Sequence, residues 1–147
     1  DGRRIIANYG LDPKLGKYHR TFCEKCGKPI EGKAPVTHCP NCDSSKITMG
    51  VFDRIEIIKD KETTKSPSFR PYIYQIPLTF MPGLGGKTID KLLSAFDTEM
   101  NILHKLSKDD IESVVGKKIA NTVICAREGN VKIQSGGGGV YGKLNLG

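Results

Sequence analysis

Four apolar residues in the second half of the chain recur with the spacing of a helix that buries one face: Ile89, Leu92, Leu93 and Phe96. Positions i, i+3, i+4 and i+7 share one side of a helix, so the pattern predicts an amphipathic helix. Directly before it stands MPGLGGKT, in which one proline and three glycines fall within five positions. Because such residues break regular structure, we expect the helix to begin at about Gly86 or Lys87.

A second helical pattern follows in LSKDDIESVVGKKIANTVICARE. Ser107 with Asp110 predicts a capping box, with aspartate where glutamate or glutamine is usual. Ile111 and Val114 face inward on the first helix, and a turn follows at Gly116. The next helix has its own apolar face, formed by Ile119, Ala120, Val123 and Ile124. The pattern therefore predicts two helices that meet at Gly116.

The remaining segments show weaker patterns. RRIIANYG predicts a strand, followed by a turn-rich loop, LDPKLGKYHR. GVFDRIEII also predicts a strand, because Val51, Ile55 and Ile57 alternate imperfectly with polar residues. RPYIYQIPL predicts a short extended segment before the helices, and residues 130–147, which contain GGGG, predict a loop and a weak hairpin.

Four cysteines form two C-x2-C pairs with twelve residues between them: Cys23 and Cys26, then Cys39 and Cys42. Two such knuckles supply the four converging thiolates that a tetrahedral ion needs, so the spacing predicts one structural Zn2+. Disulfides, a redox pair and iron are the alternatives. His38 could compete as a ligand, although four cysteines already close the site. Cys125 stands alone in a helical pattern and is expected to pack in a core.

Charge and hydropathy narrow the possible partners. The 147 residues contain 23 lysines and arginines against 16 acidic residues, for a net charge of +7. This excess suits a nucleic-acid partner, but a solvated basic surface gives the same number. No run of 18 apolar residues occurs, which excludes a membrane-spanning helix. No signal peptide precedes the cysteines, so we expect a reducing, cytoplasmic compartment and no membrane partner.

The glycines before the first helix suggest a phosphate site. The first amides of a helix are unpaired, and glycine lets a phosphate approach them closely. Lys87 and Thr88 would add side-chain contacts, with Lys91 one turn further on. The alternative is a glycine-rich turn between two packed helices that binds nothing.

MPGLGGKTIDKLL resembles the helix-hairpin-helix motif, in which an apolar residue and Pro-Gly-apolar-Gly precede a helix. The resemblance implies that this hairpin holds the DNA backbone without reading its sequence. The segment around Gly116 would be its structural partner, so that residues 76–128 form a tandem domain. The implied DNA-binding residues are Gly83, Leu84, Gly85, Gly86, Lys87, Thr88 and Lys91, with weaker contacts from Gly116, Lys117 and Lys118.

The order of segments resembles the C-terminal part of the endonuclease Q family: GKYH, the two knuckles, GVFDRI, RPYIYQIPL, the hairpin and GGGGVYGK. That family implies a DNA repair hydrolase with an N-terminal PHP domain that cleaves beside deaminated bases. It implies a small α+β fold, with a zinc ribbon followed by an all-α helix-hairpin-helix domain. The expected division is 1–58 for the end of the catalytic domain plus the ribbon, 59–68 for a linker, 69–129 for the helices and 130–147 for a glycine-rich loop.

The resemblance also implies what this chain lacks. PHP-type catalysis needs clustered histidines and aspartates for divalent metals, and only His19, His38 and His104 occur here, far apart. We therefore expect the catalytic metals and their ligands to lie upstream of Asp1, and this chain alone not to hydrolyse DNA. Its implied partners are DNA, including lesion-containing duplex, and its own PHP domain.

Several aromatic and basic residues are candidates for contact with the substrate. Tyr18 and His19 stand before the first knuckle, and Arg54 either contacts DNA or pairs with a local carboxylate. Three further tyrosines could stack on a base or simply pack: Tyr72, Tyr74 and Tyr141. The four glycines at 136–139 are either a floppy linker or the closing loop of the family.

Two other functions are weighed against DNA binding. A zinc ribbon with helices could bind protein or structured RNA in transcription or translation, but the glycine hairpin favours DNA. A complete small enzyme is disfavoured, because no nucleophile–base pair or open metal site is evident in the sequence.

Overall fold

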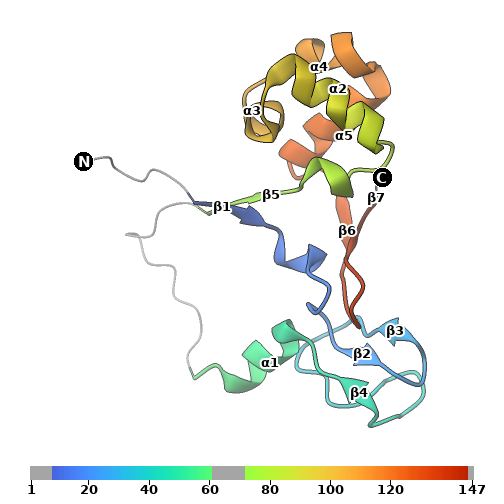
Figure 1. Cartoon of the computed structure of the whole chain (residues 1–147). Coiled ribbons are helices and arrows are strands. Elements are labelled where there is room, and N and C mark those ends of the chain that lie inside the picture. Colours follow the sequence, from blue (N-terminus) through green and yellow to red (C-terminus); the bar gives the residue numbers. More distant parts are fainter. Residues whose placement is uncertain (1–7, 61–71, 146–147) are drawn as a thin grey trace. The chain divides into compact units, whose positions relative to one another are not determined.

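The computed structural model of the chain describes residues 8–60 and 72–145 (Figure 1). It divides them into two compact units, each with its own packing. The unit called here the ribbon unit contains residues 8, 12–60, 72 and 133–143. The helical unit contains residues 9–11, 73–132 and 144–145. As expected, the fold is a small α+β one, with short strands around four cysteines and a separate set of helices.

Three short strands form the sheet of the ribbon unit in the order β3-β2-β4: β2 (Phe22–Cys23), β3 (Lys28–Pro29) and β4 (Ile47–Thr48). Both neighbours run antiparallel to β2, so Cys23 lies opposite Lys28 on one side and Ile47 on the other. The core of this unit is Cys23, Ile30 and Cys39, with four partly buried residues against it: Cys26, Val36, Cys42 and Ile47. This small core is built mainly around the cysteines, which is the usual situation of a domain that depends on a metal.

The strand predicted for GVFDRIEII is wrong, because α1 (Val51–Ile58) is a helix. Its inward residue is Asp53, which is fully buried, whereas Val51, Ile55 and Ile57 are exposed. The apolar residues that suggested a strand therefore lie on the side of the helix that faces solvent. The first amides of the helix, which have no partner within it, find acceptors in a segment that is distant in sequence. The amides of Val51 and Phe52 donate to the carbonyls of Tyr18 and His19 at 2.8 and 3.1 Å.

Asp53 is held by three hydrogen bonds. Its carboxylate accepts from the amide and the hydroxyl of Thr21 at 3.2 and 2.9 Å, and from the amide of Val36 at 2.9 Å. A buried carboxylate is costly unless it is hydrogen-bonded in this way. The bonds attach α1 to the residue just before β2 and to the loop between β3 and β4.

The helical unit contains four α-helices: α2 (Gly86–Phe96), α3 (Glu99–His104), α4 (Lys108–Val115) and α5 (Lys117–Arg127). Helix α4 packs against both α2 and α5, and α3 also contacts α2 and α5. The largest side chains that are almost completely buried in this core are Leu78, Leu92, Ile102, Ile111 and Val123. Helix α2 begins at Gly86, and the capping box of Ser107 and Asp110 is present, so both sequence predictions are confirmed.

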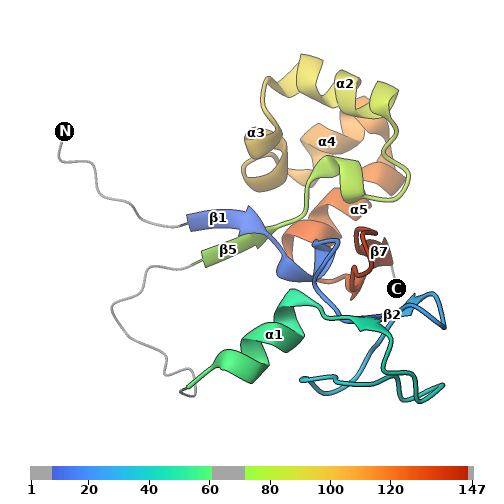
Figure 2. The same cartoon turned by 60° about the horizontal axis from the view of Figure 1, so that its bottom comes forward.

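Strand β1 (Asn8–Leu11) pairs with β5 (Tyr72–Gln75), and Figures 1 and 2 show the two side by side.

Arg127 at the end of α5 donates to three carbonyls at the end of α3 at 2.7 to 2.9 Å: Ile102, Leu103 and Leu106. A cation that satisfies the last carbonyls of a helix stabilises its C-terminus. The rest of the predicted N-terminal strand and residues 61–68 of the predicted linker lie outside the described residues.

The expected hairpin near the C-terminus is present as β6 (Lys132–Gln134) paired with β7 (Lys143–Asn145). The glycine loop between them, Gly136–Gly142, is hydrogen-bonded to the segment that follows the 3-10 helix Pro13–Leu15 and to that helix itself. Gly136 donates to Lys14, Gly139 donates to Lys17, and the amide of Arg20 donates to Gly136, at 2.8 to 3.1 Å. The loop is therefore a packed part of the ribbon unit and not a free linker. None of the described helices is long and apolar enough to cross a membrane.

Candidate metal centre and nucleic-acid interface

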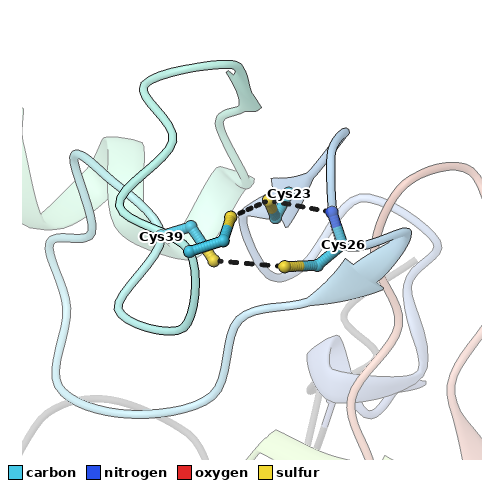
Figure 3. A group of neighbouring side chains, drawn as sticks. Cys23, Cys26 and Cys39 are labelled. Carbon is cyan, nitrogen blue, oxygen red and sulfur yellow. Dashed lines mark hydrogen bonds between the residues drawn. The ribbon is translucent and has the colours of Figure 1, made fainter.

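The four predicted metal ligands converge on one point. The sulfur atoms of Cys23, Cys26, Cys39 and Cys42 all lie within 4.8 Å of one another. Two sulfur pairs, Cys23 with Cys42 and Cys26 with Cys39, are each 3.7 Å apart. Figure 3 shows the sulfurs of Cys26 and Cys39 pointing toward one another across the site.

The backbone around each pair explains this convergence. In the first knuckle the amide of Gly27 donates to the carbonyl of Cys23, and Gly27 has a φ of +65°, which glycine adopts without strain. In the second, Asp43 donates to Cys39 with its own φ at 53°. Each turn brings both of its cysteines to the same side.

The sulfur geometry fits a tetrahedral zinc ion. With metal–sulfur bonds of about 2.3 Å, a tetrahedron separates its ligand sulfurs by about 3.8 Å. Hydrogen bonding with Cys42 and Cys39 raises the pKa of the Cys26 thiol to about 12. Burial opposes ionisation of Cys39, but the amides of Asn41 and Cys42 bring its pKa down to about 7. Four thiolates this close repel one another, so a central cation is what holds them together. The cluster is thus consistent with one structural zinc.

The glycine turn before α2, residues 83–86, has buried side chains on one side and open space on the other. Met81 and Leu84 are buried, and Gly83 has a φ of +86°. A Cβ atom on Gly83 would lie 3.2 Å from Cδ1 of Ile119, whereas a Cβ on Gly85 or Gly86 would meet nothing within 4 Å. The fold therefore explains Gly83, but packing does not require the other two glycines.

The first turn of α2 offers unpaired donors. The amides of Thr88 and Ile89 bond to the carbonyl of Gly85. Within the residues that the structure describes, the amides of Gly86 and Lys87 have no acceptor. Lys87 and Lys91 are exposed and Thr88 is half-buried. Bare amides at a helix N-terminus, with a lysine beside them, form an electropositive surface.

The turn at Gly116 repeats this arrangement beside the first one. Gly116 has a φ of +83° and precedes α5 directly, so the exposed Lys117 and Lys118 form the first turn of that helix. Because Gly83 lies against Ile119, which is in the same turn of α5, the two glycine turns are neighbours. The sequence placed both turns in one domain, but their contact comes only from the packing of α2, α4 and α5.

Tyr18, His19 and Arg54 lie in the ribbon unit and not at the glycine turns. Tyr18 is exposed, and the ring of His19 stacks on Phe52 with the centroids 5.3 Å apart. Burial, followed by the charge of Arg20, lowers the pKa of His19 below its usual 6.5. Arg54 is exposed on α1.

The sequence analysis missed Arg20, a buried arginine that organises the ribbon unit. Its guanidinium donates to the carbonyls of Ile30 and Gly32 at 3.1 and 2.9 Å, and it lies over the ring of Phe52. These partners are distant in sequence, so no local pattern could have revealed them.

Comparisons with known proteins give a consistent set of relatives. No protein-family model matches the sequence. The uncharacterized protein YqxK of Bacillus subtilis (strain 168) is 48% identical over 145 residues, which are 98% of this chain and 36% of that protein. An uncharacterized protein of Methanocaldococcus jannaschii is 38% identical over 97% of this chain and 20% of that protein.

Two solved structures share the fold. The lesion-specific endonuclease PfuEndoQ from Pyrococcus furiosus matches 99% of this chain with 31% identity and a TM-score of 0.75. A structure of endonuclease Q in complex with a 27-mer duplex substrate that has an abasic lesion at the active site matches the whole chain with 32% identity and a TM-score of 0.77. The chain spans about two fifths of these structures, 39% and 40% of their length.

Proposed function

Over its whole length the chain matches the C-terminal two fifths of endonuclease Q structures, and on that premise we propose that it is the DNA-holding part of a repair endonuclease. The observation that carries the proposal is the pair of neighbouring glycine turns, each of which opens a helix with exposed lysines. This part of the protein grips the backbone of DNA and positions it for cleavage beside a deaminated base.

Two helix N-termini side by side suit a phosphodiester backbone. The amides of Gly86 and Lys87 donate to one phosphate, and the side chain of Lys87 neutralises it. Lys117 and Lys118, at the start of α5, contact a nearby phosphate. Gly85 and Gly86 have no side chain that would keep the strand away from these amides. Contacts of this kind hold DNA in register without reading its bases.

The zinc ion has a structural role in this proposal. Four cysteine ligands fill a tetrahedral coordination shell and leave no position for a water molecule. Hydrolysis of the phosphodiester by metal-activated water belongs to the PHP domain, in the part of the family proteins that this chain does not span. The ribbon unit braces the junction with that domain.

The experiment that tests the backbone grip is binding of labelled duplex DNA, plain and deoxyuridine-containing, across a salt series. We expect salt-dependent binding that is equal for both duplexes, because phosphate contacts release counterions whatever the sequence. Lys87→Glu should weaken binding of both about tenfold or more and make the salt dependence shallower.

Lys105→Glu is the matched control, since it makes the same charge change on an exposed lysine. Lys105 stands at the C-terminus of a different helix, α3, and not at a helix N-terminus. It should have a much smaller effect. If the two variants lose affinity equally, DNA binding depends only on the net charge of the protein, and the glycine turns are not the DNA-binding site. Binding to structured RNA in preference to duplex DNA would favour the role in transcription or translation.

A further inference from the structure

Helix α1 of the ribbon unit turns its apolar side chains outward, although it is only eight residues long. Val51, Ile55 and Ile58, at positions i, i+4 and i+7, form one stripe and are exposed to 57%, 51% and 61%. Met49, just before the helix, and Phe52 extend this surface and are also exposed. These five residues are called here the α1 face. An exposed apolar patch of this kind marks a surface that another protein surface covers.

The exposure of the α1 face does not come from a loosely attached helix. The inner side of α1 is held by the buried carboxylate of Asp53, which accepts three hydrogen bonds from Thr21 and Val36. A Cβ on Gly50, just before the helix, would collide with the backbone of Arg20, so the start of α1 lies tightly against that segment. Because these polar contacts fix the inner side, the apolar side chains are left to point outward.

The chemistry of the α1 face favours a protein partner over a nucleic acid. Surfaces that bind DNA are polar and rich in cations, whereas all five residues of the α1 face are apolar. The charged residues of the helix are of both signs: the exposed Arg54, and Lys59, whose Nζ lies 2.7 Å from a carboxylate oxygen of Glu56. An apolar centre with a polar rim of mixed charge is the usual anatomy of an interface between proteins.

The small size of the α1 face favours a partner in the same polypeptide. Eight residues of helix are about 12 Å long, whereas free proteins that associate stably bury roughly 800 Å² on each partner. A tethered domain can dock on a smaller patch, because its effective concentration is high. The chain spans about two fifths of the endonuclease Q structures that it matches, 39% and 40% of their length. The larger part of such a protein is therefore available as the partner.

We propose that the α1 face is the docking surface for the N-terminal PHP domain of the full-length protein. The apolar stripe packs against an apolar patch of that domain, and Arg54 and Glu56 lie at the polar rim of the contact. The inference rests on the proposed function, which assigns catalysis to that domain, and it names the surface through which the ribbon unit holds it. It does not depend on DNA binding at the glycine turns.

The first test is hydroxyl-radical footprinting of the wild type, in which mass spectrometry reports how fast each exposed side chain is oxidised. Met49 and Phe52 should be oxidised about fivefold more slowly in the full-length protein than in this chain alone, because the centre of an interface excludes water. Met100 on α3 is the control, since its exposure of 42% matches the 41% of Met49, and it should react equally in both proteins. Equal reactivity of Met49 and Phe52 in the two proteins would overturn the inference.

A double variant, Val51→Gln with Ile55→Gln, tests the contact itself. In this chain alone it should leave the stability of the ribbon unit unchanged or slightly higher, because glutamine is a better helix former than valine or isoleucine. In the full-length protein it should restore fast oxidation of Met49 and Phe52, because two buried amides without partners oppose docking. Ile55→Leu, which keeps the apolar contact, should keep the protection. A loss of stability in the chain alone would assign these side chains to the core of the ribbon unit and overturn the inference.

Two further measurements separate the other outcomes. Sedimentation of the chain alone should show a monomer, and a dimer that the double variant abolishes would make a second copy the partner and overturn the inference. The double variant changes no charge and lies outside the helical unit, so it should bind duplex DNA as tightly as the wild type. If the wild type does not bind duplex DNA at all, the proposed grip fails, while protection of Met49 in the full-length protein still supports docking at α1.

Discussion

The two glycine-rich segments, one in each unit, use the same residue for opposite reasons. In the glycine loop, a Cβ on Gly136 would lie 2.4 Å from the carbonyl oxygen of Gly16, and one on Gly138 would lie 2.4 Å from the ring of Phe22. In the glycine turn before α2, Gly85 and Gly86 face open space. The crowded glycines serve packing, and the open glycines leave room for something outside the chain. A count of glycines in the sequence cannot separate these two cases.

The units also differ in what stabilises them. The helical unit has a core of leucine, isoleucine and valine contributed by α2 to α5, whereas the ribbon unit is centred on cysteines and buried polar side chains such as Arg20 and Asp53. An apolar core stabilises a fold by itself, but a cysteine cluster does so only with its ion. We therefore expect the ribbon unit to stay folded only while its metal ion is bound, and the helical unit to stay folded without it.

Removal of the metal should give the largest effect. Structural zinc sites contribute about 10–16 kcal/mol to small domains, more than the typical stability of a domain. We expect chelation to unfold the ribbon unit and release the glycine loop, while α2 to α5 stay folded. Amide hydrogen exchange resolves the two units in one sample, and metal analysis identifies the ion.

Cys39→Ser should reproduce the effect of the chelator, and Cys125→Ser, at the cysteine outside the cluster, should not. Simultaneous loss of protection in both units would contradict the independence of their cores.

Replacement of a crowded glycine should give the next largest effect. Gly136→Ala places a methyl group against three backbone atoms at 2.4 to 2.8 Å, none of which belongs to a flexible side chain. We expect a loss of about 3 kcal/mol in the free energy of unfolding of the ribbon unit, measured by chemical denaturation. An alanine that is tolerated there would mean that the loop can lift away from residues 14–20.

The opposite result is expected at an open glycine. Gly86→Ala meets no neighbour and lies within α2, where alanine is favoured over glycine by up to about 1 kcal/mol. Stability should therefore hold or rise, while the affinity for duplex DNA falls severalfold because the methyl group stands where the phosphate approaches. The two readouts move in opposite directions only if the open space serves a ligand.

Gly83→Ala is the comparison variant within the same turn. Its φ of +86° strains any other residue, so it should lose about 1–2 kcal/mol of stability as well as affinity. Unchanged DNA binding by Gly86→Ala would reduce the glycine turn to a connection between helices.

The sequence was sufficient where one local pattern determines one local structure. The two C-x2-C turns, the start of α2 at Gly86 and the capping box at Ser107 each depend on residues a few positions apart, and all are present. It failed at α1, a helix whose first amides donate to the distant carbonyls of Tyr18 and His19 and whose apolar side chains face solvent. The contact between the two glycine turns also depends on long-range packing.

The smallest expected effect is a pH dependence that both units share. Burial lowers the pKa of His19 in the ribbon unit and of His104 in the helical unit below 6.5, with nearby Arg20 and Arg127 adding to it. The folded chain thus prefers neutral histidine, so this contribution to stability is complete above pH 6.5. It is lost as the pH falls below that value, because the unfolded chain takes up the proton first.

Denaturation of the helical unit at pH 7.5 and pH 5.5 should therefore show a lower free energy of unfolding at the lower pH, by a fraction of the roughly 1.4 kcal/mol that one unit of pKa represents. His104→Gln removes the titrating group next to Gln75, to which its Nε2 lies at 2.9 Å. The variant should show a weaker pH dependence in the helical unit alone, and His19→Gln should do the same in the ribbon unit alone. A pH dependence that neither substitution reduces would assign the acid sensitivity to other groups.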